Sequence, residues 1–267
     1  QGYSSAASDV YKRQIVWWDL WDKFRKVLRK ELSPSRVFRV LRLQSKLVLT
    51  MTGILVFSGA FLVFIFESGN PSTLKGAPLG TKLMASFFQS VTTRTAGFYT
   101  MDQSLLSTPT VIISLLWMFI GGSPMGTAGG VKTTTIAILI LSIAAYLQGK
   151  KDVEVYGRRI RESYLRSAMV VAGTSVLILF TMTVLLSAVM PGVDLADVLY
   201  EITSAGATVG LSRGLTPQLN VAGKWIVILT MYLGRIGPLT LGTAVVMRVR
   251  NRPGSTTHLG EEDIMIG

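Results

Sequence analysis

Two short segments of the sequence share a pattern that can bind a cation through its backbone. Thr95-Ala96-Gly97-Phe98 returns as Thr208-Val209-Gly210-Leu211, 113 positions later. Potassium filters replace the hydration shell of the ion with backbone carbonyls from a loop of the Thr-Val-Gly-Tyr-Gly type, whose glycines adopt conformations that other residues resist. A single match is typical of an ordinary turn. Two copies, each behind a short amphipathic helix, favour a cation filter.

A moderately apolar stretch precedes each of these two segments, at 79–92 and at 194–205. Both stretches are too short to cross about 30 Å of hydrocarbon, so each is predicted to be a re-entrant pore helix. Pro78 and Asp194 are expected to begin these helices. The C-terminal ends of the helices carry partial negative charge, and they would point toward the bound cation.

The composition is that of a membrane protein. Hydrophobic residues make up 49% of the chain and charged residues only 16%, and the mean hydropathy is +0.46, which is too apolar for a typical soluble domain. The predicted fold class is therefore an all-α membrane protein with two parallel repeats of outer helix, pore loop and inner helix. The repeats are expected at 46–149 (outer helix 46–67, filter 95–98, broken inner span 109–148) and 167–248 (outer helix 167–190, filter 208–211, inner helix 224–248).

Basic residues predict the orientation in the membrane. Eleven of the 27 Lys and Arg residues lie between Lys12 and Lys46, and a further nine lie in 150–166 and 248–252. By the positive-inside rule, the segments 15–45, 150–166 and 249–267 face the cytoplasm of a multi-pass protein in the plasma membrane. The net charge of +12 belongs to these flanking segments, so it does not indicate nucleic-acid binding.

Residue types that serve most enzymes are missing from the sequence. It has no cysteine and one histidine, His258, in a polar stretch, which excludes thiolate metal sites and disulfides. The ionisable residues inside the predicted spans are Lys132 and Arg235, and neither is accompanied by a carboxylate. We therefore expect neither an enzyme nor an organic cofactor, and the available chemistry is that of backbone carbonyls.

A glycine-rich segment interrupts the first inner span. Five glycines and a proline fall within 121–130, a composition that does not sustain a continuous helix. Irregular backbone at membrane depth is tolerated only where protein or a water-filled cavity covers it. The segment is thus either a functional loop or a packing kink.

Arg235 lies near the middle of the last span. A guanidinium at that depth costs about 2.5 to 3.5 kcal/mol or more unless it faces protein or water. We therefore expect Arg235 to face the pore, with a purely structural partner as the alternative.

Three further segments have less specific interpretations. Residues 1–14 resemble a translated adapter rather than native sequence, with a disordered native tail as the alternative, and the start at Ile15 suggests missing upstream sequence. The basic, tryptophan-containing stretch 17–26 fits either the surface of the bilayer or a cytosolic partner. Asp197 and Glu201, on the second pore helix, are taken as solvated or as weak cation attractors.

Three stretches of the sequence resemble the Trk/Ktr/HKT superfamily, with the membrane subunit of Ktr systems as the nearest type. They are 90–98 (Ser-Val-Thr-Thr-Arg-Thr-Ala-Gly-Phe), the region from Gly121 to Thr135, and 234–240 (Gly-Arg-Ile-Gly-Pro-Leu-Thr); the acidic ending 261–267 is also similar. The resemblance covers residues 15 to 267 and corresponds to the third and fourth of the four repeats of the family.

The resemblance implies a potassium-conducting subunit in a pseudo-fourfold pore, of which this chain supplies half. It also implies a homodimer of such pores, a cytosolic nucleotide-binding regulatory ring (KtrA-like), and transport of K+ with possible Na+ coupling. The missing N-terminal half, or a second copy of this chain, would complete the pore. The implied gate residues are Gly121, Gly122, Ser123, Pro124, Gly126, Gly129, Gly130, Lys132 and Arg235, with the loop obstructing the pore below the filter.

Two alternatives to a potassium transporter remain from the sequence. One is a sodium-permeable or non-selective transporter of the same fold, which a serine in place of a filter glycine would favour; Gly97 and Gly210 are both glycines. The other is a non-conducting membrane fragment or scaffold. Such a scaffold has no need of duplicated filter segments, although an inactive fragment would retain them.

Overall fold

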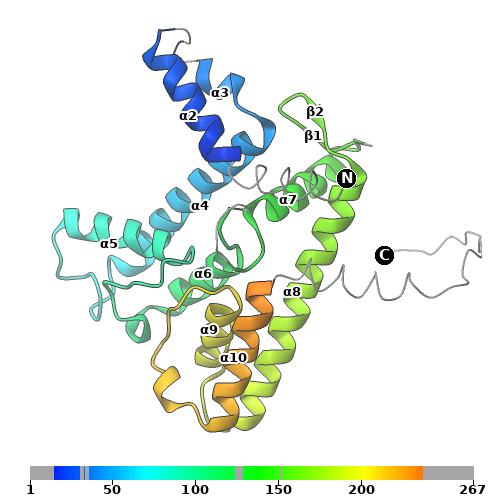
Figure 1. The fold of residues 1–267 in the computed structure, drawn as a ribbon. Helices are drawn as coiled ribbons and strands as arrows, with labels where there is room; N and C mark the ends of the chain where they lie inside the picture. The colour runs from blue at the N-terminus through cyan, green and yellow to red at the C-terminus, as the bar shows by residue number, and fades with distance from the viewer. Residues whose placement is uncertain (1–14, 31–32, 34–35, 124–128, 151, 237–267) are drawn as a thin grey trace, which may run out of the picture.

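The computed structural model describes residues 15–30, 33, 36–123, 129–150 and 152–236, which form a mainly helical chain (Figure 1). The first repeat contains α4, α5, α6 and α7, and the second contains α8, α9 and α10. The elements are α2 Ile15–Leu28, α3 Val37–Val40, α4 Leu43–Glu67, α5 Leu79–Thr92, η2 Gln103–Leu105, α6 Thr108–Phe119, α7 Thr133–Leu147, β1 Glu154–Val155, β2 Arg158–Arg159, α8 Glu162–Val189, α9 Leu195–Gly206, η3 Thr216–Gln218 and α10 Val221–Ile236.

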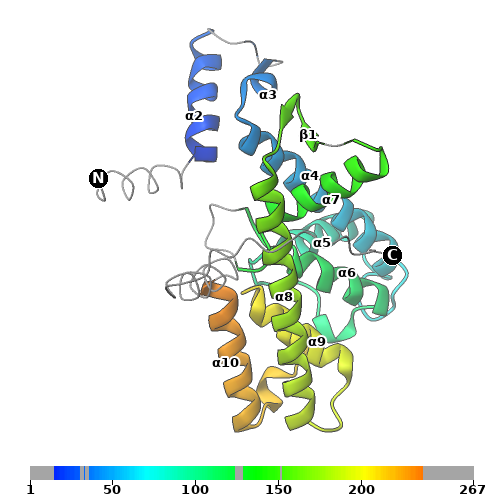
Figure 2. The ribbon, with the colours of Figure 1, turned by 90° about the vertical axis from the view of Figure 1, so that its right-hand side faces the viewer.

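The outer helix makes corresponding contacts in both repeats. In the first repeat α4 packs on α5 and α6, and in the second α8 packs on α9 and α10. The repeats meet where α6 contacts α9 and where α7 contacts α8. Figures 1 and 2 show α8, α9 and α10 side by side in both views. The short helices α5 and α9 are therefore each held against a long outer helix.

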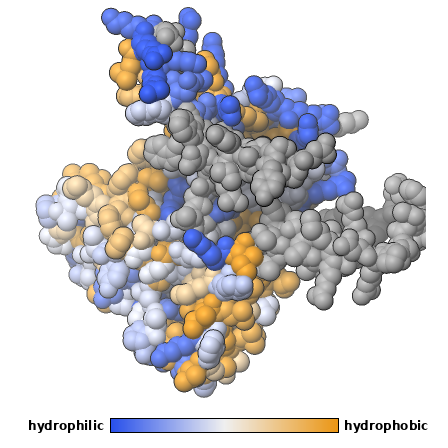
Figure 3. Space-filling model, viewed as in Figure 1, coloured by the Kyte–Doolittle hydropathy of each residue, from blue (hydrophilic) through white to orange (hydrophobic). Residues whose placement is uncertain are grey.

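Helices α4 and α8 are long and apolar enough to cross a membrane. Only 22% and 17% of their most apolar windows are buried inside the protein, whereas the core helix of a soluble protein would be mostly covered. Large hydrophobic side chains such as Phe57, Phe61 and Phe180 are exposed. Figure 3 shows hydrophilic residues gathered at the end that holds α2 and the β hairpin, and hydrophobic residues over the lower part of the molecule. This arrangement fits helices that face lipid.

The helix boundaries extend beyond the uncharged runs from which they were predicted. Helix α8 begins at Glu162 rather than at 167, and its first turn contains an exposed i,i+4 ion pair of 2.9 Å between Glu162 and Arg166. Helix α4 begins at Leu43, where the carboxylate of Asp19 accepts hydrogen bonds from the backbone N–H of Arg42 (3.0 Å) and the hydroxyl of Ser45 (2.8 Å). A remote aspartate thus caps the helix and ties α2 to it.

A small β hairpin is an addition to the predicted helical fold. The segment 150–166, expected to be a loop, contains the antiparallel strands β1 and β2. Tyr156 and Gly157 connect them with φ of 50° and 73°, which are the backbone angles of a tight I′ hairpin turn. The hydroxyl of Tyr156 lies 2.8 Å from that of Thr50 on α4, and its ring packs edge-on against Phe38. These contacts, remote in sequence, hold the hairpin beside α3 and α4.

Several predicted segments fall outside the described residues. They include 1–14, Pro124, Gly126, the part of the second inner span beyond Ile236, and the tail 249–267; the side chains of Trp17 and Trp18 in the amphipathic stretch do as well.

Candidate functional site

The two filter segments follow directly on the ends of the pore helices and share an unusual backbone. Thr95 and Gly97 have φ of 75° and 77°, and the equivalent Thr208 and Gly210 have φ of 55° and 94°. A β-branched residue rarely adopts a positive φ. The same alternation therefore arises twice, at sites 113 residues apart, which indicates a built conformation rather than two unrelated turns.

The glycines of the two filter segments bring their backbones together. A Cβ atom at Gly97 would overlap the carbonyl oxygen of Val209 and would lie 3.5 Å from the Cα atom of Gly210. A Cβ atom at Gly210 would in turn lie 3.6 Å from the Cα atom of Gly97. Equivalent positions of the two segments thus face each other across a contact that leaves no room for a side chain at Gly97.

Each filter segment hydrogen-bonds to the last turn of its own pore helix. In the first copy the backbone N–H of Ala96 donates to the carbonyl of Thr92 (3.1 Å), and the hydroxyl of Thr92 donates to the carbonyl of Phe98. In the second copy the N–H of Val209 donates to the carbonyl of Ser204 (2.9 Å), and the N–H of Gly210 donates to its hydroxyl (3.2 Å). The pore helices therefore fix the backbones of both segments.

Two acidic residues of α9 have structural contacts, which corrects their interpretation as solvated groups. Glu201 is 6% exposed and accepts hydrogen bonds from the hydroxyls of Ser212 (2.7 Å) and Thr216 (2.5 Å). Asp197 forms an ion pair of 2.6 Å with Arg213. The sequence does not reveal these partners. The other expectation, that the two acids weakly attract cations, stays a prediction. Asp194 does occupy the N-cap position of α9, but its side chain makes no capping hydrogen bond.

Glu67, at the end of α4, is a buried anchor that the sequence analysis did not identify. Its carboxylate accepts hydrogen bonds from Asn70 (2.7 Å), from Thr73 (2.5 Å), and from both the backbone N–H (2.9 Å) and the hydroxyl (2.7 Å) of Ser107. Ser107 immediately precedes α6. The signal in the sequence is a carboxylate directly after twenty uncharged residues, a position that requires polar partners.

Replacing Glu67 with glutamine should lower the free energy of unfolding by about 1 to 3 kcal/mol, because one acceptor oxygen becomes an NH2 group that faces donors. Glu162→Gln is the matched control: its carboxylate forms only an exposed ion pair, so a change within about 0.5 kcal/mol is expected. Thermal unfolding of the detergent-solubilised chain measures both. Equal shifts for the two variants would contradict the anchoring role of Glu67.

The glycine-rich loop begins and ends in a narrow neck. Ile120 and Val131 form a parallel β bridge, and the N–H of Val131 donates to the carbonyl of Phe119 (3.1 Å). A Cβ atom at Gly121 would overlap the carbonyl oxygen of Gly129. The first inner span is therefore two helices, α6 and α7. The chain between them leaves α6 and returns to α7 side by side, with Gly121 in close contact with Gly129.

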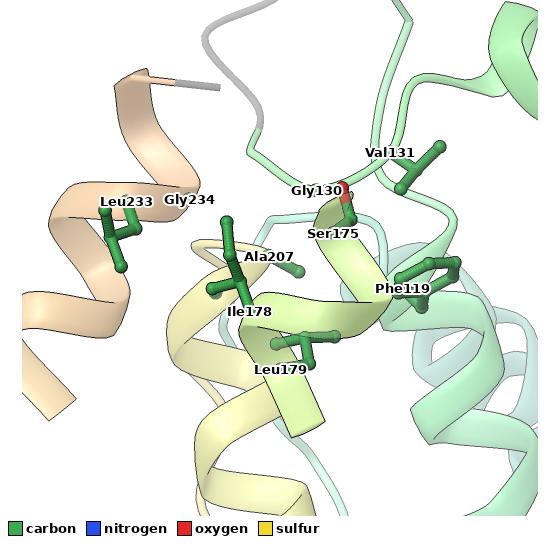
Figure 4. A pocket seen from close by; sticks show the side chains of 10 residues that line it. Phe119, Gly130, Val131, Ser175, Ile178, Leu179, Ala207, Leu233 and Gly234 are labelled. Carbon is green, nitrogen blue, oxygen red and sulfur yellow. The ribbon is translucent and has the colours of Figure 1, made fainter. Parts of the chain in front are cut away.

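The neck of this loop touches the second filter segment. The backbone N–H of Gly129 donates to the hydroxyl of Thr208 (2.8 Å), and a Cβ atom at Gly129 would lie 2.7 Å from the same oxygen. Gly130 and Val131 border a small apolar cavity of about 30 Å³ that also involves Ala207 and Gly234 (Figure 4). The loop thus packs directly under the end of α9.

Arg235 shares a cavity of about 490 Å³ with the second filter segment. Residues 208–211 line this cavity together with Ser204 of α9 and Met231 of α10. Lys132 occupies the N-cap position of α7, directly after the loop. The structure therefore places Arg235 beside the second filter segment and Lys132 at the end of the loop.

The comparison with protein families decides the classification. A family model described as TrkH, cation transport protein, matches residues 25–252. The chain belongs to the TrkH family of cation transport proteins. Because this is a family of transporters, the chain is not an enzyme.

Individual relatives cover most of this TrkH-family chain. It is 40% identical over 210 residues to the Ktr system potassium uptake protein B of Bacillus subtilis, covering 79% of this chain and 47% of that protein. It is 35% identical over 256 residues to the potassium/sodium uptake protein NtpJ of Enterococcus hirae, covering 95% and 54%. The chain spans about half the length of these relatives.

A solved structure has the same fold. The potassium transporter TrkH from Vibrio parahaemolyticus superposes with a TM-score of 0.62 at 19% identity, covering 79% of this chain and 45% of that one. At this identity the likeness shows the fold alone. The shared fold, the family match and the two long apolar helices together show that this chain is a mostly helical membrane protein.

The residues predicted for the site fall into three groups. The two filter segments meet at Gly97, Val209 and Gly210, and Gly121, Gly129 and Gly130 lie in the neck, where Gly129 bonds to Thr208. Gly122 and Ser123 follow Gly121 in the chain. Arg235 lines the same cavity as the second filter segment, and Lys132 directly follows the loop. The hydroxyl-bearing residues Thr92 and Ser204, which hold the filter backbone, were not predicted; their position within three or four residues of each filter threonine was the available signal.

Proposed function

We propose that this chain supplies two of the four filter strands of a potassium-conducting pore, corresponding to the third and fourth repeats of a Trk/Ktr-type uptake subunit. The observation that carries the proposal is the pair of filter segments, which share one alternation of φ and face each other at Gly97 and Gly210. Alternating handedness turns successive peptide carbonyls toward one side, which is the arrangement that carbonyl coordination of a cation requires.

The remaining filter strands would come from the N-terminal half of a longer protein, with a second copy of this chain as the alternative source. The names of the relatives support potassium as the cation and leave sodium as a co-transported or competing ion. A homodimer, a cytosolic nucleotide-binding ring and an orientation with α2 and the β hairpin in the cytoplasm belong to the same proposal. The basic residues of α2, α3 and the hairpin gather at one end of the molecule (Figures 1 and 3), which supports this orientation.

The experiment that tests this function is rubidium uptake in a strain that lacks its own potassium uptake systems. The chain alone is compared with the chain joined to the first half of the Bacillus subtilis relative. Uptake by the joined protein only supports a half-pore, and uptake by the chain alone means that two copies complete a filter. The absence of uptake in both, with protein present in the membrane, would favour the non-conducting scaffold. A rate of sodium uptake equal to that of rubidium would favour the non-selective transporter.

The glycine-rich loop 121–130, with Lys132 and Arg235, is proposed as the gate of this pore. Two observations support it: the hydrogen bond from Gly129 to Thr208, and the cavity that Arg235 shares with the second filter segment. A fixed positive charge beside the path raises the barrier for a cation, because like charges repel each other.

Replacing Arg235 with alanine should therefore speed rubidium flux several-fold in the joined protein, with little effect on the amount of protein in the membrane. The control is Lys224→Ala, which removes an exposed positive charge at the other end of α10. Initial uptake rates at saturating rubidium measure the effect. Unchanged or slower flux in Arg235→Ala would count against a role for Arg235 as a barrier.

A further inference from the structure

A buried cluster of polar side chains joins the two repeats close to both filter segments. Its centre is formed by Gln89 from α5, Gln103 from η2 and Tyr200 from α9, whose exposed fractions are 0%, 1% and 0%. Buried polar groups are costly unless they are hydrogen-bonded. Because the residues of this cluster come from both repeats, their hydrogen bonds are satisfied only in one relative position of the two repeats.

The amide of Gln103 uses its full hydrogen-bonding capacity. Its Oε1 accepts from Nε2 of Gln89 (2.7 Å) and from the hydroxyl of Tyr200 (2.8 Å). Its Nε2 donates to Oε1 of Gln89 (3.2 Å) and to the carbonyl of Met101 (2.6 Å). A side-chain amide has two donors and two acceptor lone pairs, so each of them is satisfied. One side chain thus connects the first pore helix, the chain after the first filter segment and the second pore helix.

The cluster also reaches the chain that leaves the second filter segment. Arg213, two residues after Leu211, donates through Nη1 to the backbone carbonyl of Gln103 (3.3 Å) and through Nε to the carboxylate of Asp197 (2.6 Å). Gln103 itself lies five residues after Phe98. The chain segments that follow both filter segments are therefore tied to each other and to α9.

Among the described residues the two filter segments form no hydrogen bond to each other, and the side chains of Val209 and Leu211 are buried in an apolar cluster that also contains Met101 and Tyr200. The two segments meet at Gly97 and Gly210, where backbone faces backbone with no side chain between. Their spacing must therefore be imposed by the structure around them. Such close-packed surroundings transmit small displacements because they contain few voids.

We propose that the cluster of Gln89, Gln103, Tyr200 and Arg213 positions the two filter segments relative to each other, and so determines how strongly the filter prefers potassium or rubidium over sodium. This inference rests on the proposed function. None of these residues belongs to a filter segment; they bond to each other and to the chain that follows each filter segment, so they are positioning residues. Their loss should change the ratio of cation affinities, whereas a merely structural role would change only the amount of folded protein.

The sharpest test is Tyr200→Phe, which removes one hydroxyl and keeps the ring. In the chain joined to the first half of the Bacillus subtilis relative, it should lower the preference for rubidium over sodium by about five-fold, the equivalent of one net hydrogen bond. The effect should appear mainly in the rubidium KM. Tyr146→Phe, at an exposed tyrosine of α7, is the matched control and should leave the ratio unchanged.

A second pair of variants removes the amide. Gln103→Leu should reduce the preference further than Tyr200→Phe, and Gln148→Leu, at the exposed end of α7, should not. Protection of the purified joined protein against thermal unfolding, by KCl compared with NaCl, reports cation preference without requiring transport. Rubidium uptake by the parent protein tests the proposed function separately.

The inference is overturned if Tyr200→Phe keeps the cation ratio of the parent protein in both measurements. It is equally overturned if the Tyr200 and Gln103 variants lower only the amount of protein in the membrane and the maximal rate. Tyr200→Phe leaves the core volume nearly unchanged, so this variant should fold. Its cation ratio therefore tests the inference even if Gln103→Leu does not fold.

Discussion

Replacing Gly97 with alanine should abolish rubidium uptake by the chain joined to a related first half. The φ of 77° at Gly97 disfavours any residue with a Cβ atom, and this Cβ would overlap the carbonyl oxygen of Val209. The obstacle is backbone rather than a flexible side chain, so relief requires the two filter segments to separate. Their carbonyls would then no longer coordinate a cation together.

The control for Gly97→Ala is Gly80→Ala, on the pore helix that precedes the same filter segment. A Cβ atom at Gly80 would meet nothing within 4 Å, and alanine in a helix is neutral or slightly stabilising. Uptake rates and membrane levels of both variants provide the comparison. Normal uptake by Gly97→Ala would show that this position is not part of a conducting filter.

Replacing Gly234 with alanine should lower stability and also abolish uptake. A Cβ atom at Gly234 on α10 would overlap the carbonyl oxygen of Gly206 and lie 2.7 Å from its carbonyl carbon. Gly206 is the last residue of α9 and lies two residues before Thr208, where the second filter segment begins. Forcing extra volume into a packed contact typically costs about 1 to 3 kcal/mol, and the displaced element here is the support of the filter.

Gly173→Ala is the corresponding control on α8, where an added Cβ would meet nothing within 4 Å. Thermal unfolding in detergent should show a lower melting temperature for Gly234→Ala and an unchanged one for Gly173→Ala. If Gly234→Ala retained both the parent melting temperature and the parent uptake rate, the close contact between α9 and α10 would have no functional importance.

The second filter segment differs from the first in its contact with the loop. Among the described residues, the hydroxyl of Thr208 accepts a hydrogen bond from the backbone of Gly129, whereas Thr95 has no equivalent bond. The two repeats therefore share a backbone conformation but have different surroundings. A movement of the proposed gate would act first on the second segment.

Much of this arrangement follows from local features of the sequence. Uncharged runs of twenty residues or more predict α4 and α8, because their length matches the thickness of the hydrocarbon layer. The repeat at an offset of 113 predicts two copies of one backbone conformation, because glycine at the same place in each copy permits the same positive φ. The glycine-rich segment predicts the break between α6 and α7 for the same kind of local reason.

The sequence by itself therefore determined the long apolar helices, the repetition of one backbone conformation at 95–98 and 208–211, and the break between α6 and α7. Only the tertiary structure decided which polar groups meet: Gln103 with Tyr200, Glu67 with Ser107, and Gly129 with Thr208. These partners lie 97, 40 and 79 residues apart. Helix length and backbone angles depend on neighbouring residues, whereas a hydrogen bond between distant residues depends on how the helices pack.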